Sequence, residues 1–283
     1  MKRILSIILC IVLISALTAC GGNPDTSADT SSVGSEAVSS VSASSAAASS
    51  RVVSAVQKDK PVRILPMGDS LTQGGQHEPP VSAYRGFLGE MLDGDGVEYV
   101  FTGAHDWSGE SITNYQLMHS GYGGADVNYL AEELPKIENR DPDIVLLMVG
   151  RNDNTGGNYG EPLAQKIYDK LVKPMLDMFP DVTVYVASVP PIRDYGGGEW
   201  IDEGDRAQVY TNPAIKKMVE EHKKAGERVE FVDMGIEATG LVWQDFTAED
   251  FVHPQADGYK KIAEQWHNAI KDKVAEISKQ ING

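Results

Sequence analysis

Short apolar strands alternate with amphipathic helices over most of the sequence, and this alternation restricts the fold more than any other feature. Residues 143–149 and 182–188 are rich in apolar and β-branched residues without a helical period, which is typical of strands buried in a parallel sheet. Residues 229–233 and, more marginally, 98–102 fit the same pattern. Strands that alternate with helices predict an α/β protein whose parallel sheet is covered on both faces.

The helices are expected where apolar residues recur at helical spacing. This spacing predicts helices near residues 127–137 and 163–175, and another from about Gln255 onward. Pro174 is expected to kink the second of them, because proline has no backbone N–H to donate. The expected apolar face of the last helix is Tyr259, Ile262, Ala263, Trp266, Ile270 and Val274.

The first 19 residues are typical of a targeting segment. Lys2 and Arg3 precede an apolar stretch, residues 4–17, that is too short to span a bilayer comfortably. The stretch ends in Leu17-Thr18-Ala19-Cys20, and small residues before a cysteine resemble the bacterial lipobox, in which the cysteine is lipidated and becomes the new N-terminus. We expect a lipoprotein signal peptide over residues 1–19. An ordinary signal peptide with an incidental cysteine is the alternative.

Residues 20–60 are expected to be the lipidated Cys20 followed by a flexible tether. Serine and alanine dominate, and so few large apolar residues cannot offset the entropy lost on ordering. The globular domain then spans residues 61–283, enough for one sizeable core. This organisation predicts an extracytoplasmic protein that Cys20 anchors in the lipid bilayer of the bacterial cell membrane. Cys10 would be removed with the signal peptide, so no disulfide is expected.

The net charge of −16 at pH 7 restricts the partners. A chain this acidic has no electrostatic reason to bind nucleic acid or to be drawn to anionic lipid. Acidity does not otherwise identify a substrate.

A hydroxyl stands directly after the first predicted strand, which contains Val62, Ile64 and Leu65. The strand ends at Gly68-Asp69-Ser70-Leu71. Sites form at the carboxyl ends of strands in open parallel sheets. Ser70 is therefore a candidate nucleophile, although its hydroxyl needs a base to accept the proton. The alternative is that Ser70 only caps the next helix.

Three later segments add polar groups at turns. Gly124 precedes a predicted helix, where its backbone N–H could face a ligand, or it could simply form a tight turn. Asn152 follows a buried strand, and its amide could hydrogen-bond a developing oxyanion or form an Asx turn. Asp250 stands three residues before His253 and could hold one ring nitrogen while the other acts as a base. A surface His–Asp pair is the alternative there.

Together these segments resemble a known superfamily. Gly68-Asp69-Ser70-Leu71, Gly124, Gly150-x-Asn152-Asp153 and Asp250-x-x-His253 match, in order, the four blocks of the SGNH, or GDSL-type, hydrolases over residues 61 to about 260. The resemblance implies a flavodoxin-like three-layer α/β/α sandwich. It also implies that Ser70 is the nucleophile of a serine esterase, with His253 as general base and Asp250 as the residue that orients it.

The same resemblance implies an oxyanion hole and no metal or organic cofactor. The hole would consist of the backbone N–H groups of Ser70 and Gly124 and the side chain of Asn152. The chain contains no Gly-x-Ser-x-Gly, which argues against the nucleophile elbow of α/β-hydrolases.

Finer details are similar to acetylxylan-esterase-like members, which implies that short acyl groups, acetyl first, are removed from carbohydrate. These details are Tyr84-Arg85-x-x-Leu88, His119-x-Gly121-x-x-Gly124 and Asp250-x-Val252-His253-Pro254-x-x-x-Gly258-Tyr259.

We expect Asp69, Arg151 and Trp200 to contact the substrate. Arg151 stands where members of that superfamily more often have threonine. It could touch substrate or pair with an acid such as Asp153. Trp200 could stack on a sugar ring or anchor a lid. The acidic residues Asp202, Glu203 and Asp205 could hold calcium, but their spacing matches no calcium loop that we can name, and no metal is predicted.

Two other functions stay open. One is a lysophospholipase or thioesterase of the same superfamily, which the sequence separates poorly from a carbohydrate esterase. The other is a non-catalytic carbohydrate-binding lipoprotein, since a lipobox and tether also present solute-binding proteins. The set Ser70, Gly124, Asn152, Asp250 and His253 favours an enzyme, because a binding module needs neither an oriented base nor an oxyanion hole.

Overall fold

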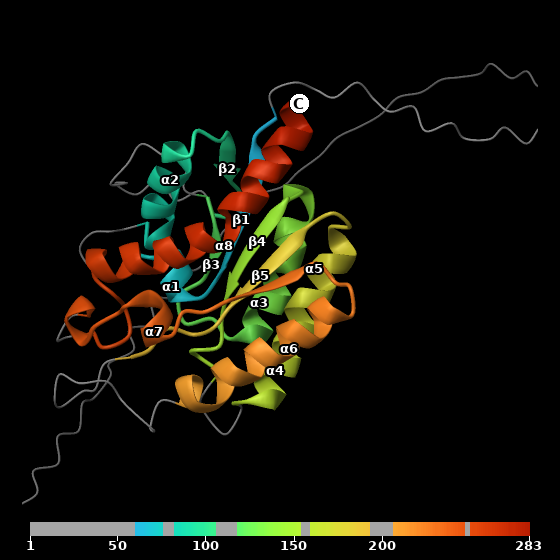
Figure 1. Cartoon of the computed structure of the whole chain (residues 1–283). Coiled ribbons are helices and arrows are strands. Elements are labelled where there is room, and N and C mark those ends of the chain that lie inside the picture. The colour runs from blue at the N-terminus through green and yellow to red at the C-terminus, as the bar shows by residue number, and fades with distance from the viewer. Residues whose placement is uncertain (1–59, 76–81, 106–117, 154–158, 193–205, 247–249) are drawn as a thin grey trace, which may run out of the picture. The chain divides into compact units, whose positions relative to one another are not determined.

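The computed structural model describes residues 60–75, 82–105, 118–153, 159–192, 206–246 and 250–283 (Figure 1). The predicted signal peptide, Cys20 and the tether up to residue 59 lie outside the described residues, as do Trp200 and the acidic residues after it.

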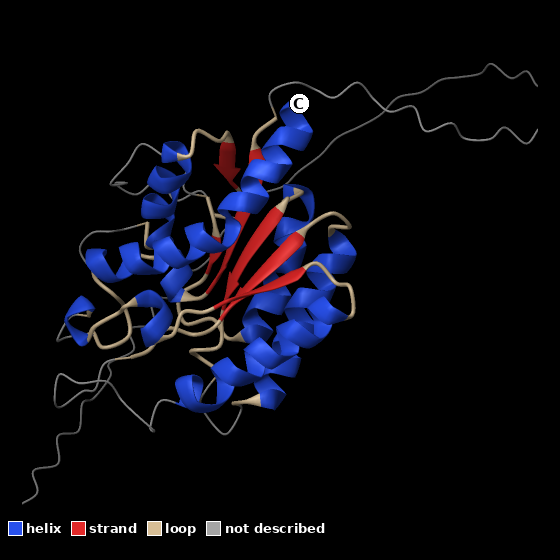
Figure 2. Cartoon of the chain, viewed as in Figure 1, coloured by secondary structure: helices blue, strands red, loops and turns tan. Residues whose placement is uncertain are grey.

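A parallel sheet forms the centre of the domain (Figure 2). Its five main strands follow the order β2-β1-β4-β5-β6, and every pairing between them is parallel. A two-residue strand, β3 (Ser120–Gly121), pairs with the end of β1. Without β3 the order is the 2-1-3-4-5 of flavodoxin-like folds. The strands are β1 (Val62–Gly68), β2 (Tyr99–Phe101), β4 (Ile144–Met148), β5 (Thr183–Ala187) and β6 (Val229–Val232).

Alternate side chains of each buried strand point to opposite faces of the sheet, so both faces are apolar. Helices cover both of them (Figure 1). On one face Ile64 and Leu146 pack in a core with α2 (Tyr84–Gly94) and α8 (Ala256–Asn282). On the other face Leu65 and Leu147 pack in a second core with a different set of helices. These are α3 (Val127–Glu133), the 3₁₀ helix η1 (Leu134–Arg140), α4 (Glu161–Ile167), the π turn η2 (Tyr168–Val172), α5 (Lys173–Met178) and α6 (Asn212–Lys224).

The predicted three-layer α/β/α fold is therefore confirmed. Shorter elements complete it at the turns. They are α1 (Ser70–Gln73), η3 (Ala207–Thr211), α7 (Ile236–Thr239) and η4 (Trp243–Asp245).

Two helices differ in detail from their expected form. The helix expected near residues 163–175 is α4 followed by the π turn η2 and by α5, and Pro174 lies in the first turn of α5. A proline is tolerated in a first turn because that N–H has no intrahelical acceptor, and the preceding hydrogen bonds widen to the π pattern. The helix expected near residues 127–137 changes to 3₁₀ geometry at Leu134, just before Pro135.

The part of the chain that the structure describes contains no helix long and apolar enough to cross a membrane.

Candidate active site

The predicted site residues that the structure describes lie at the carboxyl edge of the sheet, either in turns that follow strands or in the loop before α8. Ser70 follows β1, Asn152 follows β4, and His253 lies in the loop just before α8. Ser70 is the first residue of the one-turn helix α1 and is 8% exposed. Neighbouring parallel strands end at the same edge, so residues far apart in the sequence meet there.

A chain of hydrogen bonds joins Ser70, His253 and Asp250. The Ser70 Oγ lies 2.7 Å from His253 Nε2, although 183 residues separate the two. His253 Nδ1 lies 2.5 Å from Asp250 Oδ2. Because a carboxylate only accepts, Nδ1 of the ring donates to Asp250, and Nε2 of a neutral ring is then the acceptor for the serine hydroxyl. The arrangement can remove a proton from Ser70.

The Asp250 carboxylate also shapes its own loop. Its Oδ1 accepts hydrogen bonds from the backbone N–H of Val252 (2.9 Å) and of His253 (3.0 Å). An aspartate commonly folds a turn in this way. The three-residue spacing in the sequence therefore places Oδ2 beside the ring while Oδ1 fixes the backbone.

The loop is fastened at its far end by the segment before it. Phe246 forms an antiparallel bridge with Pro254, and the Gln255 N–H donates to Asp245 O at 2.7 Å. Lys261 Nζ, on α8, donates to Asp245 Oδ2 at 2.8 Å. His253 thus belongs to a loop tied to the first turns of α8.

The turn that carries Ser70 requires a glycine before it. A Cβ at Gly68 would lie 2.2 Å from Met148 O and 2.5 Å from Thr72 Oγ1. Only glycine allows β4 and the following turn to come this close. Asp69 caps α1, since its Oδ1 accepts the Leu71 N–H at 2.9 Å.

Asp69 is buried, with 1% of its surface exposed. Burial raises the pKa of the Asp69 carboxyl to about 6, against the lowering effects of the Leu71 hydrogen bond and of the nearby Arg151 charge. The structure gives Asp69 a capping contact. Its predicted contact with substrate stays a prediction.

Asn152 and Asp153 tie the turn after β4 to the segment that contains Gly124. The Asn152 Nδ2 donates to Ala125 O at 2.9 Å, and Asp153 Oδ2 accepts the Val127 N–H at 3.0 Å. Gly124 is exposed and has φ of +75°, a left-handed conformation that favours glycine. The structure therefore brings Asn152 and Gly124 to the same pair of linked turns.

Arg151 donates through Nη2 to Pro190 O, a carbonyl in the segment after β5. The Asp153 carboxylate, which the sequence offered as a partner for Arg151, accepts from Lys166 Nζ at 2.8 Å instead. Sequence reasoning missed Lys166, because a lysine on a helix gives no signal of a buried partner 13 residues earlier.

Three other described histidines make contacts of their own. His222 stacks on Tyr168 and lies 3.1 Å from Glu227 Oε1, and His267 Nε2 lies 2.7 Å from Asp95 Oδ2. Both helical histidines thus have carboxylate partners that the sequence spacing did not reveal. His119 accepts the Gly121 N–H through Nδ1, and burial, with the nearby charge of Arg85, lowers its pKa to about 2.

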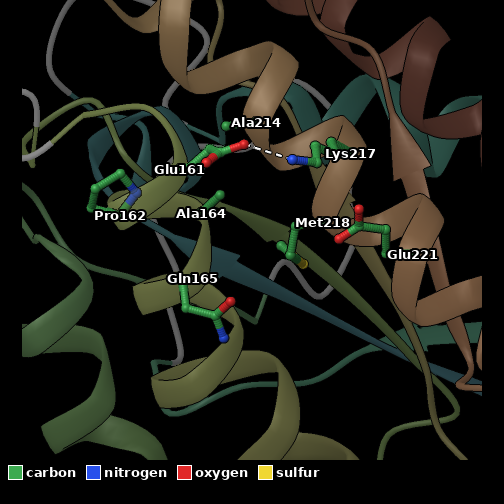
Figure 3. A pocket seen from close by; sticks show the side chains of 8 residues that line it. All are labelled: Glu161, Pro162, Ala164, Gln165, Ala214, Lys217, Met218 and Glu221. Carbon is green, nitrogen blue, oxygen red and sulfur yellow. Dashed lines mark hydrogen bonds and ion pairs between the residues drawn. The ribbon is translucent and has the colours of Figure 1, made fainter.

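A separate groove lies between α4 and α6 (Figure 3). It has a volume of about 370 Å³, and an ion pair of 2.6 Å joins Lys217 and Glu161 at its rim. Its lining consists of α4 and α6 residues, and none of the predicted site residues is among them. Among the described residues, no group of acidic, histidine or cysteine side chains could hold a metal ion.

The sequence and the fold are similar to those of known proteins. The sequence matches the model of the GDSL-like Lipase/Acylhydrolase family over residues 67–261. A multidomain esterase of Ruminococcus flavefaciens is 26% identical over 235 residues, which are 74% of this chain and 28% of that protein. The chain thus spans less than a third of that relative.

Solved structures of carbohydrate esterases share the fold. A family 3 carbohydrate esterase of Clostridium thermocellum has a TM-score of 0.64 at 24% identity, covering 77% of this chain and all of that one. A family 3 carbohydrate esterase of Talaromyces cellulolyticus has a TM-score of 0.62 at 21% identity, covering 76% of this chain and 99% of that one.

Proposed function

Because the chain belongs to the GDSL-like lipase/acylhydrolase family, we propose that it is a serine esterase whose reacting groups are Ser70, His253 and Asp250. The observation that supports the proposal most directly is the continuous hydrogen-bonded chain from Ser70 Oγ through both nitrogens of His253 to Asp250. A serine that served only as a helix cap would not need an imidazole held by a carboxylate.

The first half of the reaction acylates Ser70. His253 Nε2 takes the hydroxyl proton while Oγ forms a bond to the ester carbonyl carbon, and the carbonyl π electrons move to oxygen. The bond to the leaving alcohol oxygen then breaks, and that oxygen receives the proton from Nε2. Asp250 Oδ2 holds the ring and stabilises its charged form throughout.

The second half repeats these steps with water. His253 removes a proton from a water molecule as its oxygen attacks the acyl carbon. When the intermediate collapses, the bond to Ser70 Oγ breaks and His253 returns the proton to the serine. The products are a carboxylic acid and the free enzyme.

The negative charge on the intermediate needs donors that are already in place. We assign this role to the backbone N–H groups of Ser70 and Gly124 and to the Asn152 side chain. Ser70 begins α1, and N–H groups in the first turn of a helix have no intrahelical acceptor. One Asn152 N–H is fixed by Ala125 O, which orients the amide so that its other N–H can face the oxyanion.

The proposed substrate is a carbohydrate that carries short acyl groups, acetyl first. Two observations support this class: the resemblance of the Tyr84-Arg85, His119 and Val252-His253-Pro254 segments to acetylxylan-esterase-like sequences, and the names of the similar proteins, which are esterases of carbohydrate. Arg151 and Trp200 remain proposed substrate contacts, Trp200 in a segment outside the described residues.

We also propose that the esterase is anchored outside the cytoplasm through a lipidated Cys20. Residues 1–19 would be the signal peptide, 20–60 the tether and 61–283 the hydrolase domain. Polysaccharide esters are available to a protein in this place.

Hydrolysis of esters of increasing chain length tests the proposal. The assay compares kcat/KM for 4-nitrophenyl esters from acetyl to octanoyl, together with acetate release from acetylated xylan, for the wild type and Ser70→Ala. We expect kcat/KM to fall with chain length and Ser70→Ala to be inactive on every substrate. An apolar acyl channel would contribute about 0.8 kcal/mol per methylene. A rise in kcat/KM along the series, without acetate release from xylan, would favour a lipid-directed hydrolase instead.

A further inference from the structure

Arg85 is a buried cation whose contacts the reaction does not use directly. It is the second residue of α2 and has no exposed surface. Burial lowers the pKa of its guanidinium to about 10, so the group keeps its charge at neutral pH. Burying a charged side chain is costly unless it is well paired. The hydrogen-bond acceptors that Arg85 has among the described residues are backbone carbonyls.

Both acceptors belong to the turn that carries Ser70. Arg85 Nη1 donates to Thr72 O and, at 3.2 Å, to Gln73 O. These are the last two carbonyls of α1, a helix of four residues that begins at Ser70. The final carbonyls of a helix have no intrahelical donor, and a cation there also interacts favourably with the helix dipole.

The rest of the Arg85 guanidinium is poorly satisfied. Within the described residues, Arg85 Nε and Nη2 are buried and have no hydrogen-bond partner. An apolar side chain of similar length would avoid this cost. The charge is therefore explained by the two carbonyls that it does reach.

Other contacts leave the Ser70 turn little room to move. A Cβ on Gly68 would lie 2.5 Å from Thr72 Oγ1, and a Cβ on Gly121 would lie 2.5 Å from Gln73 N. The Tyr84 hydroxyl lies 3.4 Å from Thr72 Oγ1. Strands β1 and β3 thus pack against the turn from one side, and α2 reaches it through Tyr84 and Arg85.

We infer that Arg85 is a positioning residue, which holds the carbonyl end of α1 so that the Ser70 hydroxyl stays within hydrogen-bonding distance of His253. The inference rests on the proposed role of Ser70 as nucleophile. Arg85 does not touch the reacting atoms, and it acts through the one-turn helix. Errors of about 1 Å in the placement of reacting groups cost on the order of 10²-fold in rate.

The test compares Arg85→Met and Arg85→Lys with a matched control, Arg63→Met. Arg63 lies near the opposite end of β1 and likewise donates to a backbone carbonyl, Arg140 O, so its loss tests structure without touching the Ser70 turn. For each variant we measure kcat and KM on 4-nitrophenyl acetate, the rate of Ser70 labelling by a phosphonate probe, and the thermal unfolding midpoint.

We expect Arg85→Met to lower kcat and the labelling rate on the order of 10²-fold, with KM changed much less. Arg85→Lys should fall between the wild type and Arg85→Met, because an ammonium reaches the same carbonyls but lacks the guanidinium fork. Arg63→Met should keep the wild-type kcat at temperatures where it is folded. A folded Arg85→Met with wild-type kcat, or equal losses of kcat in Arg85→Met and Arg63→Met, would overturn the inference.

Arg85→Lys and Ser70→Ala provide two further comparisons. If Arg85→Met does not fold, Arg85→Lys decides at a temperature where it is folded: a kcat equal to that of the wild type contradicts the inference, and a loss of several-fold supports it. Ser70→Ala separates the two proposals. An active Ser70→Ala contradicts both, whereas an inactive Ser70→Ala beside a fully active Arg85→Met contradicts the role of Arg85 alone.

Discussion

At the scale of residues, a hydrogen bond of 2.7 Å joins Ser70 Oγ and His253 Nε2, and in the proposed reaction neither residue can act without the other. Ser70→Ala and His253→Ala should each abolish nearly all turnover, and the double variant should be little worse than either single one. Residues that act together show this non-additivity. Steady-state kinetics on 4-nitrophenyl acetate, with unfolding curves to verify the fold, provide the measurement. Independent, multiplying losses in the double variant would contradict the assignment.

The Asn152 amide should contribute less than the nucleophile but more than an ordinary surface residue. We expect Asn152→Ala to lower kcat by about 10² to 10³-fold, the usual loss for one oxyanion donor. Asn128→Ala is the matched control, because Asn128 is an exposed residue on α3. If both variants retain wild-type kcat, Asn152 does not contact the developing charge.

Asp69 should make the stability of the protein depend on pH. Its pKa is about 6 in the folded state, against an ordinary value of 3.8, so the folded state holds the proton to higher pH. Where the folded state binds more protons, stability falls as pH rises, here between about pH 4 and pH 6. The shift corresponds to about 3 kcal/mol at neutral pH.

Asp69→Asn removes this titration and keeps an oxygen that can accept the Leu71 N–H. Urea unfolding at pH 4 and pH 7.5 should show the variant gaining stability relative to the wild type as pH rises. All other groups titrate in both proteins, so the difference isolates Asp69. If the free energy of unfolding changed equally with pH in both proteins, the pKa of the Asp69 carboxyl would not be raised by folding.

At this scale the sequence predicted the Asp250–His253 pair from local spacing, and it predicted the distant Ser70–His253 pair only through the resemblance to a family. The spacing of Asp250 and His253 allows their contact, and the turn in which Asp250 Oδ1 accepts the Val252 and His253 N–H groups brings the two side chains together. The contacts of Arg85 with α1, and of Lys166 with Asp153, depend on how helices pack on the sheet. No local pattern encodes that packing.

At the scale of elements, the close meeting of β1, β4 and α1 depends on Gly68. Gly68→Ala should destabilise the protein by about 1–3 kcal/mol, because the new methyl group meets backbone oxygen and the backbone must shift. Activity should fall as well, since Ser70 lies two residues later. Gly94→Ala is the matched control, because a Cβ added at Gly94 would have no atom within 4 Å. Alanine in a helix should be neutral or stabilising there. Equal unfolding midpoints for the two variants would exclude crowding at Gly68.

The five main strands were predictable, whereas the two-residue strand β3 and the internal breaks of the helices were not. Buried strands such as β4 and β5 are predicted from apolar runs, which are a property of a few neighbouring residues. The change from α4 to the π turn η2 involves hydrogen bonds that shift by one residue around Pro174. Sequence spacing predicts a disturbance there, but which residues absorb it depends on packing against the sheet.

At the scale of the whole molecule, the proposed lipid anchor at Cys20 follows from the resemblance of residues 17–20 to a lipobox. The lipobox resemblance predicts that wild-type protein partitions into the detergent phase when expressed with its own signal peptide, because two acyl chains give stable anchoring. Cys20→Ala should partition into the aqueous phase with unchanged esterase activity. Detergent phase separation with an activity assay on both phases measures this. Identical partitioning of the two proteins would contradict lipidation at Cys20.

The distance along the chain between Ser70 and His253 has a consequence for the timing of synthesis. Ser70 follows the first strand of the sheet, and its partner is made 183 residues later, immediately before the last helix. A chain still growing on the ribosome can therefore form β1 and its neighbours while it has no base for its serine. Hydrolytic competence should appear abruptly, late in translation, when the loop before α8 docks. In the proposed reaction, a chain without that loop has no base for Ser70, so the unfinished protein should not hydrolyse esters.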